Sequence, residues 1–87
     1  MGIGVVRKVT SPGSFGTALR EARKRKGVSQ AEAGKAVGID QPTVSKLEQG
    51  SPGTRLGTLF RLLAALDLEL VLQPRSRSSK EIGEEDW

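Results

Sequence analysis

The sequence predicts an all-α domain of four to five short helices, followed by one short β-strand. Apolar residues recur at helical spacing, and capping residues and glycines divide the chain into short segments. The segment 68–73 alternates apolar and polar residues and ends before Pro74, as a strand does. At 87 residues the chain has the length of one domain. A domain of this size buries only about 60% of the surface that its unfolded chain exposes, so a partner chain would add stability.

The first helix is expected to begin at Ser11 and Pro12, because serine is a good N-cap and proline suits the first helical position. Gly27 is expected to end it. One face of this helix follows the i, i+3, i+4, i+7 pattern and consists of Phe15, Ala18, Leu19 and Ala22.

Two short helices are expected next, separated by a tight turn. Ser29 and Glu32 form a capping box that opens the second helix, and Gly38 breaks it. Asp40 is expected to cap the third helix, and Gly50 to close it. The residues expected to face inward on the third helix are Val44 and Leu47.

The end of the domain combines a fourth helix with the strand. Thr54 is expected to cap this helix, whose apolar stripe consists of Leu56, Leu59, Phe60, Leu63 and Leu66. A lone strand has nothing to pair with in its own chain, so an identical strand from a second subunit is expected to complete a two-fold homodimer. The candidate dimerisation residues are Leu68, Leu70 and Leu72. We therefore divide the chain into an N-terminal arm (1–10), the domain itself (11–74) and a polar, disordered tail (75–87).

The composition removes several classes of function. The chain has no cysteine and no histidine, which excludes disulfides, thiolate zinc sites and Ser-His-Asp triads. We therefore expect neither an enzyme nor a bound metal or cofactor. The longest apolar run, residues 62–66, is far shorter than a membrane helix, and no signal peptide opens the chain. A soluble cytoplasmic protein is the expectation.

The charge is uneven along the chain. The formal net charge is +4, and residues 1–74 hold 11 basic and 6 acidic groups. A basic body favours polyanions, above all nucleic acid, although a simply solvated surface explains the charge equally well. The basic run Arg20–Lys26 could add phosphate contacts.

The segment 29–50, SQAEAGKAVGIDQPTVSKLEQG, resembles the Cro/Xre-type helix-turn-helix repressors. The matching residues are Ser29, Gln30, Ala31, Glu32, Val37, Gly38, Gln41, Val44, Ser45, Leu47 and Glu48. This resemblance implies a lambda-repressor-like fold that binds double-stranded DNA. The family usually has leucine then alanine where this chain has Ala33 then Gly34; Gly34 costs about 1 kcal/mol of helix propensity against alanine, but permits close helix approach. A purely structural helical hairpin is the alternative.

The third helix carries the candidate recognition chemistry. Glutamine, serine and lysine side chains can read base edges in a major groove, and the resembled family reads bases with the N-terminal part of this helix. The candidate DNA-binding residues are therefore Gln41, Thr43, Ser45 and Lys46, with Gln30 at a phosphate. Arg23 and Glu48 match positions that form an ion pair in phage-type repressors. Arg23 is interpreted either as a helix staple through that pair or as a side chain oriented toward a DNA phosphate.

A strand directly after the fourth helix, LDLELVLQP, narrows the resemblance to the HipB-type antitoxins. The terminal Trp87, which follows acidic residues, is a further match. This resemblance implies an antitoxin that represses its own toxin–antitoxin operon from a palindromic operator and neutralises a HipA-like kinase toxin, with Trp87 as a toxin-binding residue. A phage-type repressor with no toxin and an interaction protein that binds no DNA are the alternatives.

Overall fold

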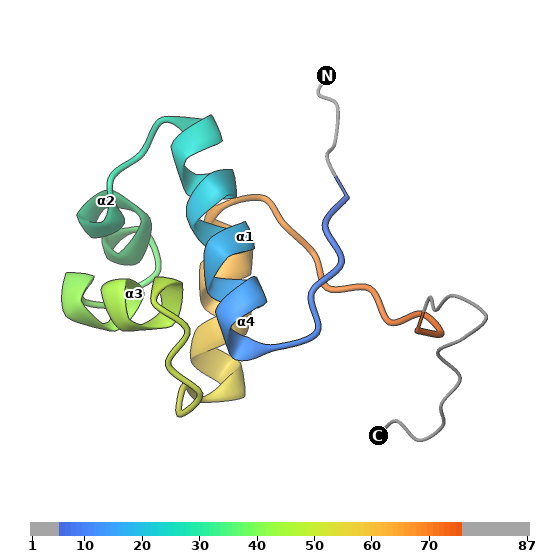
Figure 1. The fold of residues 1–87 in the computed structure, drawn as a ribbon. Coiled ribbons are helices and arrows are strands. Elements are labelled where there is room, and N and C mark those ends of the chain that lie inside the picture. Colours follow the sequence, from blue (N-terminus) through green and yellow to red (C-terminus); the bar gives the residue numbers. More distant parts are fainter. Residues whose placement is uncertain (1–5, 76–87) are drawn as a thin grey trace.

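The computed structural model describes residues 6–75, and this part of the chain forms four helices. They are α1 (Pro12–Lys26), α2 (Gln30–Lys35), α3 (Gln41–Glu48) and α4 (Leu56–Ala65). Helices α1 and α4 lie side by side, α2 and α3 cover one side of this pair, and the extended segments at the two ends leave on the other side (Figure 1). The expected all-α fold is confirmed. Residues 68–73 are extended without forming a strand in the described part of this single chain, so the intersubunit strand stays a prediction.

The first two helices begin where the sequence predicts. Ser11 caps α1, since its Oγ accepts a hydrogen bond from the Ser14 N–H at 3.0 Å. At α2, Ser29 Oγ accepts from the Glu32 N–H at 3.0 Å, and Glu32 Oε1 accepts from the Ser29 N–H at 2.8 Å. Gly27 ends α1 with a φ of 81°, the left-handed conformation that favours glycine. These local bonds fix the direction in which the chain enters the helix–turn–helix segment.

A close approach at Gly34 explains why this helix carries a glycine. A Cβ atom at Gly34 would lie 2.2 Å from the backbone oxygen of Ile39 and 3.0 Å from Cγ2 of Val44. The turn between α2 and α3 therefore packs directly against the α2 backbone. Gly34 lowers the helix propensity of α2, but its lack of a side chain allows the tight turn to close.

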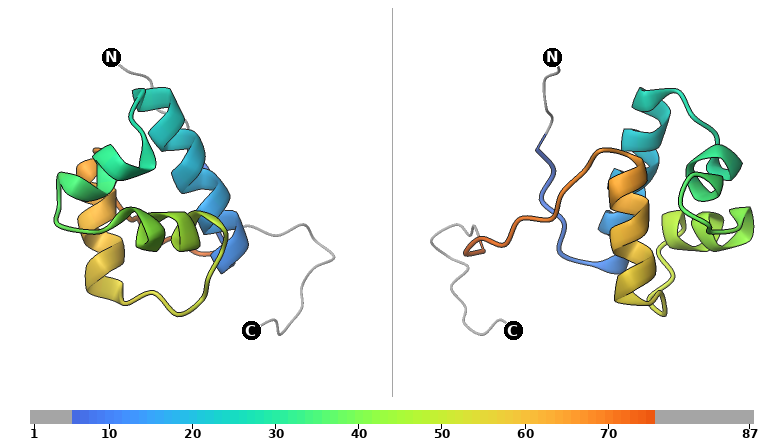
Figure 2. Two further views of the ribbon diagram at one scale, coloured as in Figure 1. Left: turned by 90° about the vertical axis from the view of Figure 1, so that its left-hand side faces the viewer. Right: turned by 180° about the vertical axis from the view of Figure 1, so that it is seen from behind.

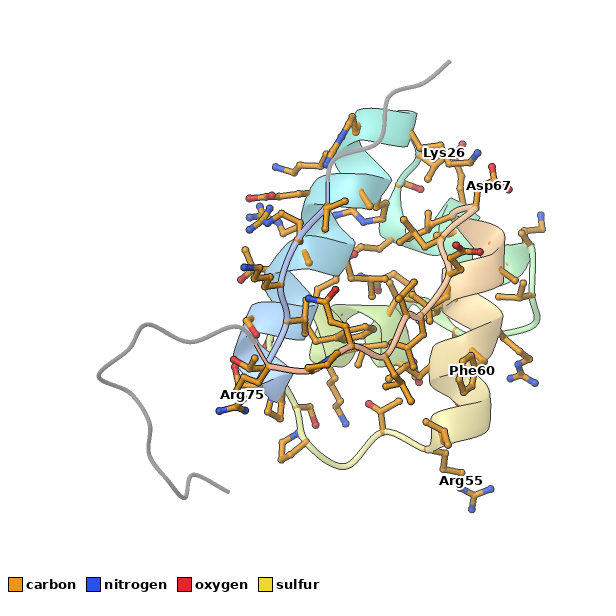
Figure 3. The ribbon with its side chains drawn as sticks, turned by 90° about the vertical axis from the view of Figure 1, so that its right-hand side faces the viewer. Lys26, Arg55, Phe60, Asp67 and Arg75 are labelled. Carbon is orange, nitrogen blue, oxygen red and sulfur yellow. The ribbon has the colours of Figure 1, made fainter. Side chains whose placement is uncertain are left out.

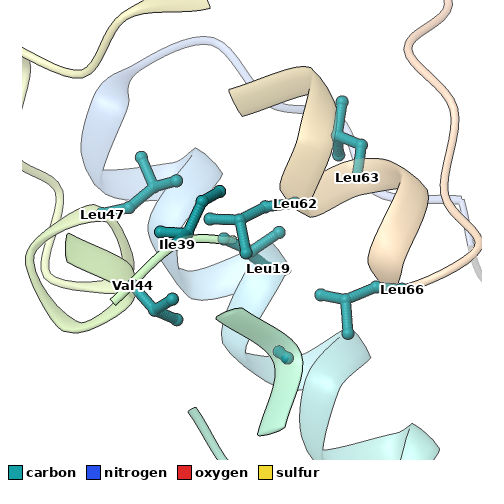
Figure 4. Packing of buried hydrophobic residues seen from close by; sticks show 8 residues of the cluster. Leu19, Ile39, Val44, Leu47, Leu62, Leu63 and Leu66 are labelled. Atoms are coloured by element: carbon teal, nitrogen blue, oxygen red, sulfur yellow. The ribbon is translucent and has the colours of Figure 1, made fainter. Parts of the chain in front are cut away.

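The core lies between all four helices and is almost entirely aliphatic (Figure 4). Its most buried side chains are those of Leu19, Val44 and Leu62, from α1, α3 and α4. The predicted inward positions of α3 are confirmed by Val44 and Leu47. On the predicted face of α1, Leu19 is buried, whereas Phe15, Ala18 and Ala22 are half-buried. The complete buried cluster is Leu19, Ala33, Ile39, Val44, Leu47, Leu62, Leu63 and Leu66.

Helix α4 differs from the prediction in its start and in its buried face. Arg55, not Thr54, is the N-cap residue, and no side chain caps the helix. Leu62 is fully buried, whereas Leu56 and Phe60 are 64% and 45% exposed. The inward face follows Leu59, Leu62, Leu63 and Leu66, the same helical spacing shifted around the helix. Phe60 projects outward from α4 (Figure 3), which leaves an apolar surface beside the extended C-terminal segment.

Within residues 6–75, no helix is both long and apolar enough to cross a membrane.

Candidate nucleic-acid interface

Helices α2 and α3 form one outer face of the molecule and cross in front of α1 and α4 (Figure 2, left). Val44 and Leu47 are buried, which turns the opposite side of α3 to solvent. That outward side carries Gln41, Pro42, Ser45, Lys46 and Gln49, of which only Ser45 is half-buried. Four of these five residues have side chains that can form hydrogen bonds with a base edge or a phosphate.

Asp40 is the N-cap of α3, as expected. Its Oδ1 accepts a hydrogen bond from the Thr43 N–H at 3.1 Å. Hydrogen bonds from Thr43 lower the pKa of Asp40, and the charge of Lys46 contributes in the same direction. The carboxylate is thereby occupied in holding the start of the helix.

A buried ion pair joins α1 to α3. Arg23 donates from Nε to Glu48 Oε2 at 2.6 Å and from Nη2 to Glu48 Oε1 at 3.0 Å. The side chains are 10% and 2% exposed. A third bond, 2.9 Å long, runs from Arg23 Nη1 to the carbonyl oxygen of Val28. The expected helix staple is therefore present, with the guanidinium bound beneath the surface.

Burial and pairing act against each other at this site. Burial opposes the charge of Glu48, but hydrogen bonds from Arg23 and Gln30 outweigh it, so the pKa of Glu48 lies below its ordinary value. The hydrogen bond to Glu48 raises the pKa of Arg23. Both groups are charged, and each depends on the other to remain so in the interior.

Two glutamines extend this ion pair to the surface. Gln30 donates from Nε2 to Glu48 Oε1 at 3.0 Å, and Gln41 donates from Nε2 to Gln30 Oε1 at 2.7 Å. The sequence identified Gln30 and Gln41 separately but not their contact. The available signal was positional, because each is the first residue of its helix.

The other candidate residues of α3, Ser45, Lys46 and Thr43, form none of the hydrogen bonds described above for the Arg23–Glu48–Gln30–Gln41 network. Gln49, which the sequence did not single out as a site residue, donates from Nε2 to Ser45 Oγ at 2.9 Å. Lys46 is exposed on the same outward face. Thr43 is half-buried on the side of α3 nearer α4 and lines a shallow depression of about 320 Å³ with Thr58 and Arg61.

The candidates for dimerisation and toxin binding lie elsewhere. Leu68, Leu70 and Leu72 belong to the extended segment on the side of the molecule opposite α2 and α3 (Figure 2, right). All three are exposed. Trp87 lies outside the described residues.

Comparisons with known proteins agree with this geometry. A family model described as helix-turn-helix matches residues 19–73. The antitoxin HipB of Escherichia coli strain K12 is 33% identical over 79 residues, which cover 91% of this chain and 90% of HipB. A solved HipB–O2 20mer complex superposes with a TM-score of 0.78 at 33% identity, covering 83% of this chain and all of that one. A HipA–HipB–O2–O3 complex gives a TM-score of 0.76 at 32% identity, covering 82% of this chain and all of the matched chain. With matches over most of its length, the chain belongs to the helix-turn-helix family and, within it, to the HipB-type antitoxins.

Proposed function

We propose that this chain is a DNA-binding antitoxin that represses its own toxin–antitoxin operon and neutralises a HipA-like kinase toxin. The observation that carries the proposal is the similarity to HipB across nine tenths of both chains. The structural match to HipB in a HipA–HipB–O2–O3 complex supports both partners. A protein that acts on operator DNA would work in the cytoplasm.

The outward face of α3 would enter the major groove of the operator. Gln41 has an amide that can both donate to and accept from adenine, and Ser45 and Lys46 can reach bases or phosphates. Thr43 is a weaker candidate, because it is half-buried on the side of α3 nearer α4. Gln30, at the start of α2, would combine a phosphate contact with its hydrogen bond to Gln41.

Arg23 would serve DNA binding indirectly. Its guanidinium is already bound to Glu48 and Val28, and its side chain is only 10% exposed. We therefore assign it a positioning role, in which it fixes Glu48 and, through Glu48, Gln30. A direct phosphate contact would require Arg23 to leave a buried partner charged and unpaired, which is costly.

The homodimer would form through the side of the molecule that faces away from DNA. Leu68, Leu70 and Leu72 follow α4 in an extended segment, and Leu72 is 90% exposed. Leu56 and Phe60 add apolar surface from α4. A two-fold dimer places two recognition helices about 34 Å apart, which fits a palindromic operator.

Trp87 is proposed as the toxin-binding residue. It follows Glu84, Glu85 and Asp86 at the end of the chain. Tryptophan is enriched among residues that dominate interface energies, and carboxylates steer a segment toward a basic surface. The tail 75–87 would then bind the toxin without taking part in DNA binding.

Binding to a duplex from upstream of its own gene and to a HipA-like protein encoded beside it tests the proposal. The full chain is expected to bind both, and a variant lacking residues 75–87 is expected to keep DNA binding while toxin binding weakens. DNA binding with no affinity for the HipA-like protein would favour a phage-type repressor. Binding to neither would favour a structural interaction protein.

A further inference from the structure

The side of the molecule opposite α2 and α3 carries two extended segments. Residues 68–75 follow α4, and residues 6–10 precede α1. In views 90° apart, both run toward the level of the α1 N-terminus; they start apart, the arm over α1 and the C-terminal segment beside α4, and converge near the start of α1 (Figures 1 and 3). Residues 68–75 include the proposed dimerisation residues, whereas residues 6–10 have no assigned role.

The C-terminal segment is fixed where it leaves α4. Asp67 adopts a φ of 58°, a conformation that non-glycine residues seldom adopt. The Leu68 N–H donates to the Leu63 carbonyl at 2.8 Å, and Lys26 Nζ bonds Asp67 Oδ2 at 2.6 Å. Beyond this point, no hydrogen bond joins the backbone of residues 69–75 to another described residue. Both edges of the segment are therefore open toward the rest of the described residues 6–75.

The N-terminal segment is fixed along α1. Arg7 forms an ion pair with Glu21, in the C-terminal half of α1, and the Thr10 N–H donates to Ser14 Oγ at 3.0 Å. These contacts hold the arm back along α1, away from α2 and α3. It therefore does not extend toward the proposed DNA surface. Val6, Val9 and Thr10 are β-branched, which suits a strand.

We propose that residues 6–10 form an outer strand of the intersubunit sheet and pair in parallel with residues 68–73 of the same chain. This inference rests on the homodimer proposed above. Two-fold pairing between copies uses one edge of each 68–73 strand and leaves the other edge open. An open edge of apolar strand invites aggregation, and proteins commonly cover it. The arm converges on this segment near the α1 N-terminus, so pairing along this edge would give a four-stranded sheet in the dimer.

Hydrogen exchange on the full-length dimer, without DNA, tests the arm directly. Amides of residues 6–10 are expected to exchange at least about tenfold more slowly than in an unstructured peptide, because the opening of a paired strand limits exchange. Dilution to the monomer should abolish this protection, because the arm and one 68–73 strand alone make a two-stranded pair that is only marginally stable in water. Exchange at the unstructured rate in a dimeric protein would overturn the inference while leaving the homodimer intact. Protection that appears only after a DNA duplex is added would also overturn it, by assigning the arm to DNA.

Sedimentation of matched variants gives a second readout. Deleting residues 2–9 is expected to weaken dimerisation about tenfold while the helical circular dichroism is retained, since the arm lies outside the helices. R7Q should weaken dimerisation less, and the charge-matched control K24Q should leave it unchanged. An unchanged dimer after the deletion would contradict the arm strand. A full chain that stays monomeric at every concentration would instead contradict the homodimer itself.

Discussion

Gln41 donates a hydrogen bond to Gln30 across 2.7 Å, so the first residue of α3 is held by the first residue of α2. Gln30 is itself bonded to Glu48, and Glu48 is paired with Arg23 in the interior. The proposed base-reading side chain is therefore the exposed end of a network anchored in the core. A side chain fixed before binding loses less conformational freedom when it meets a base.

Gln30→Ala should weaken operator binding through Gln41 as well as through the phosphate contact proposed for Gln30. Gln41→Ala is expected to cost about 1–3 kcal/mol of specific binding free energy. Because Gln30 positions Gln41, the double variant should lose less than the sum of the two single variants. Fluorescence anisotropy with an operator duplex measures all three. Strictly additive losses would mean that the two side chains act independently.

Breaking the buried ion pair should destabilise the fold strongly. Arg23→Met leaves Glu48 charged and unpaired in the interior, a change that costs about 3–5 kcal/mol. The exposed Lys24→Met is the control and should stay within about 0.5 kcal/mol of the wild type. Urea unfolding of Arg23→Met, Glu48→Gln and the double variant gives the coupling energy. A coupling energy near zero would contradict the pairing of these two residues.

Stability should fall in acid partly because of Glu48. Its pKa in the folded chain lies below the ordinary value of 4.5, so near that pH the unfolded state binds more protons than the native state. The free energy of unfolding therefore falls as the pH drops below about 4.5 and continues to fall through the folded-state pKa. Glu48→Gln should flatten this dependence. Asp40, whose pKa is also lowered, acts in the same direction, and Asp40→Asn separates its contribution. Identical pH profiles for wild type and Glu48→Gln would contradict this assignment.

Gly34→Ala separates helix propensity from packing. Propensity alone predicts a gain of about 1 kcal/mol. The structure predicts a loss instead, because the new Cβ would lie 2.2 Å from the Ile39 backbone oxygen. Gly57→Ala in α4 is the control, since a Cβ there meets nothing within 4 Å. Thermal unfolding should show a lower Tm for the first variant and an unchanged or higher Tm for the second.

The parts of the fold that were predictable from the sequence depend on local chemistry. The N-cap at Ser11, the capping box at Ser29 and the cap at Asp40 each use a side chain that bonds a backbone N–H three residues away. The buried positions of α3 follow because only two strongly apolar residues occur in that helix.

Helix α4 and the glutamine network were less predictable because they depend on tertiary context. Helix α4 is apolar on most of its surface, so periodicity does not separate the core-facing Leu62 from the exposed Phe60. A residue that packs against a second subunit resembles a core residue in the sequence. The contact between Gln30 and Gln41 joins residues 11 apart, and only the geometry of the tight turn brings them together.

The central claim is that the outward face of α3 reads operator DNA. Titrating wild type, Gln41→Ala and Lys46→Ala against cognate and scrambled duplexes at two salt concentrations tests it most directly. We predict that Gln41→Ala reduces the preference for the cognate duplex, whereas Lys46→Ala weakens binding to both duplexes alike and reduces the salt slope by about 1. If both variants bind both duplexes as the wild type does, α3 is not the recognition helix.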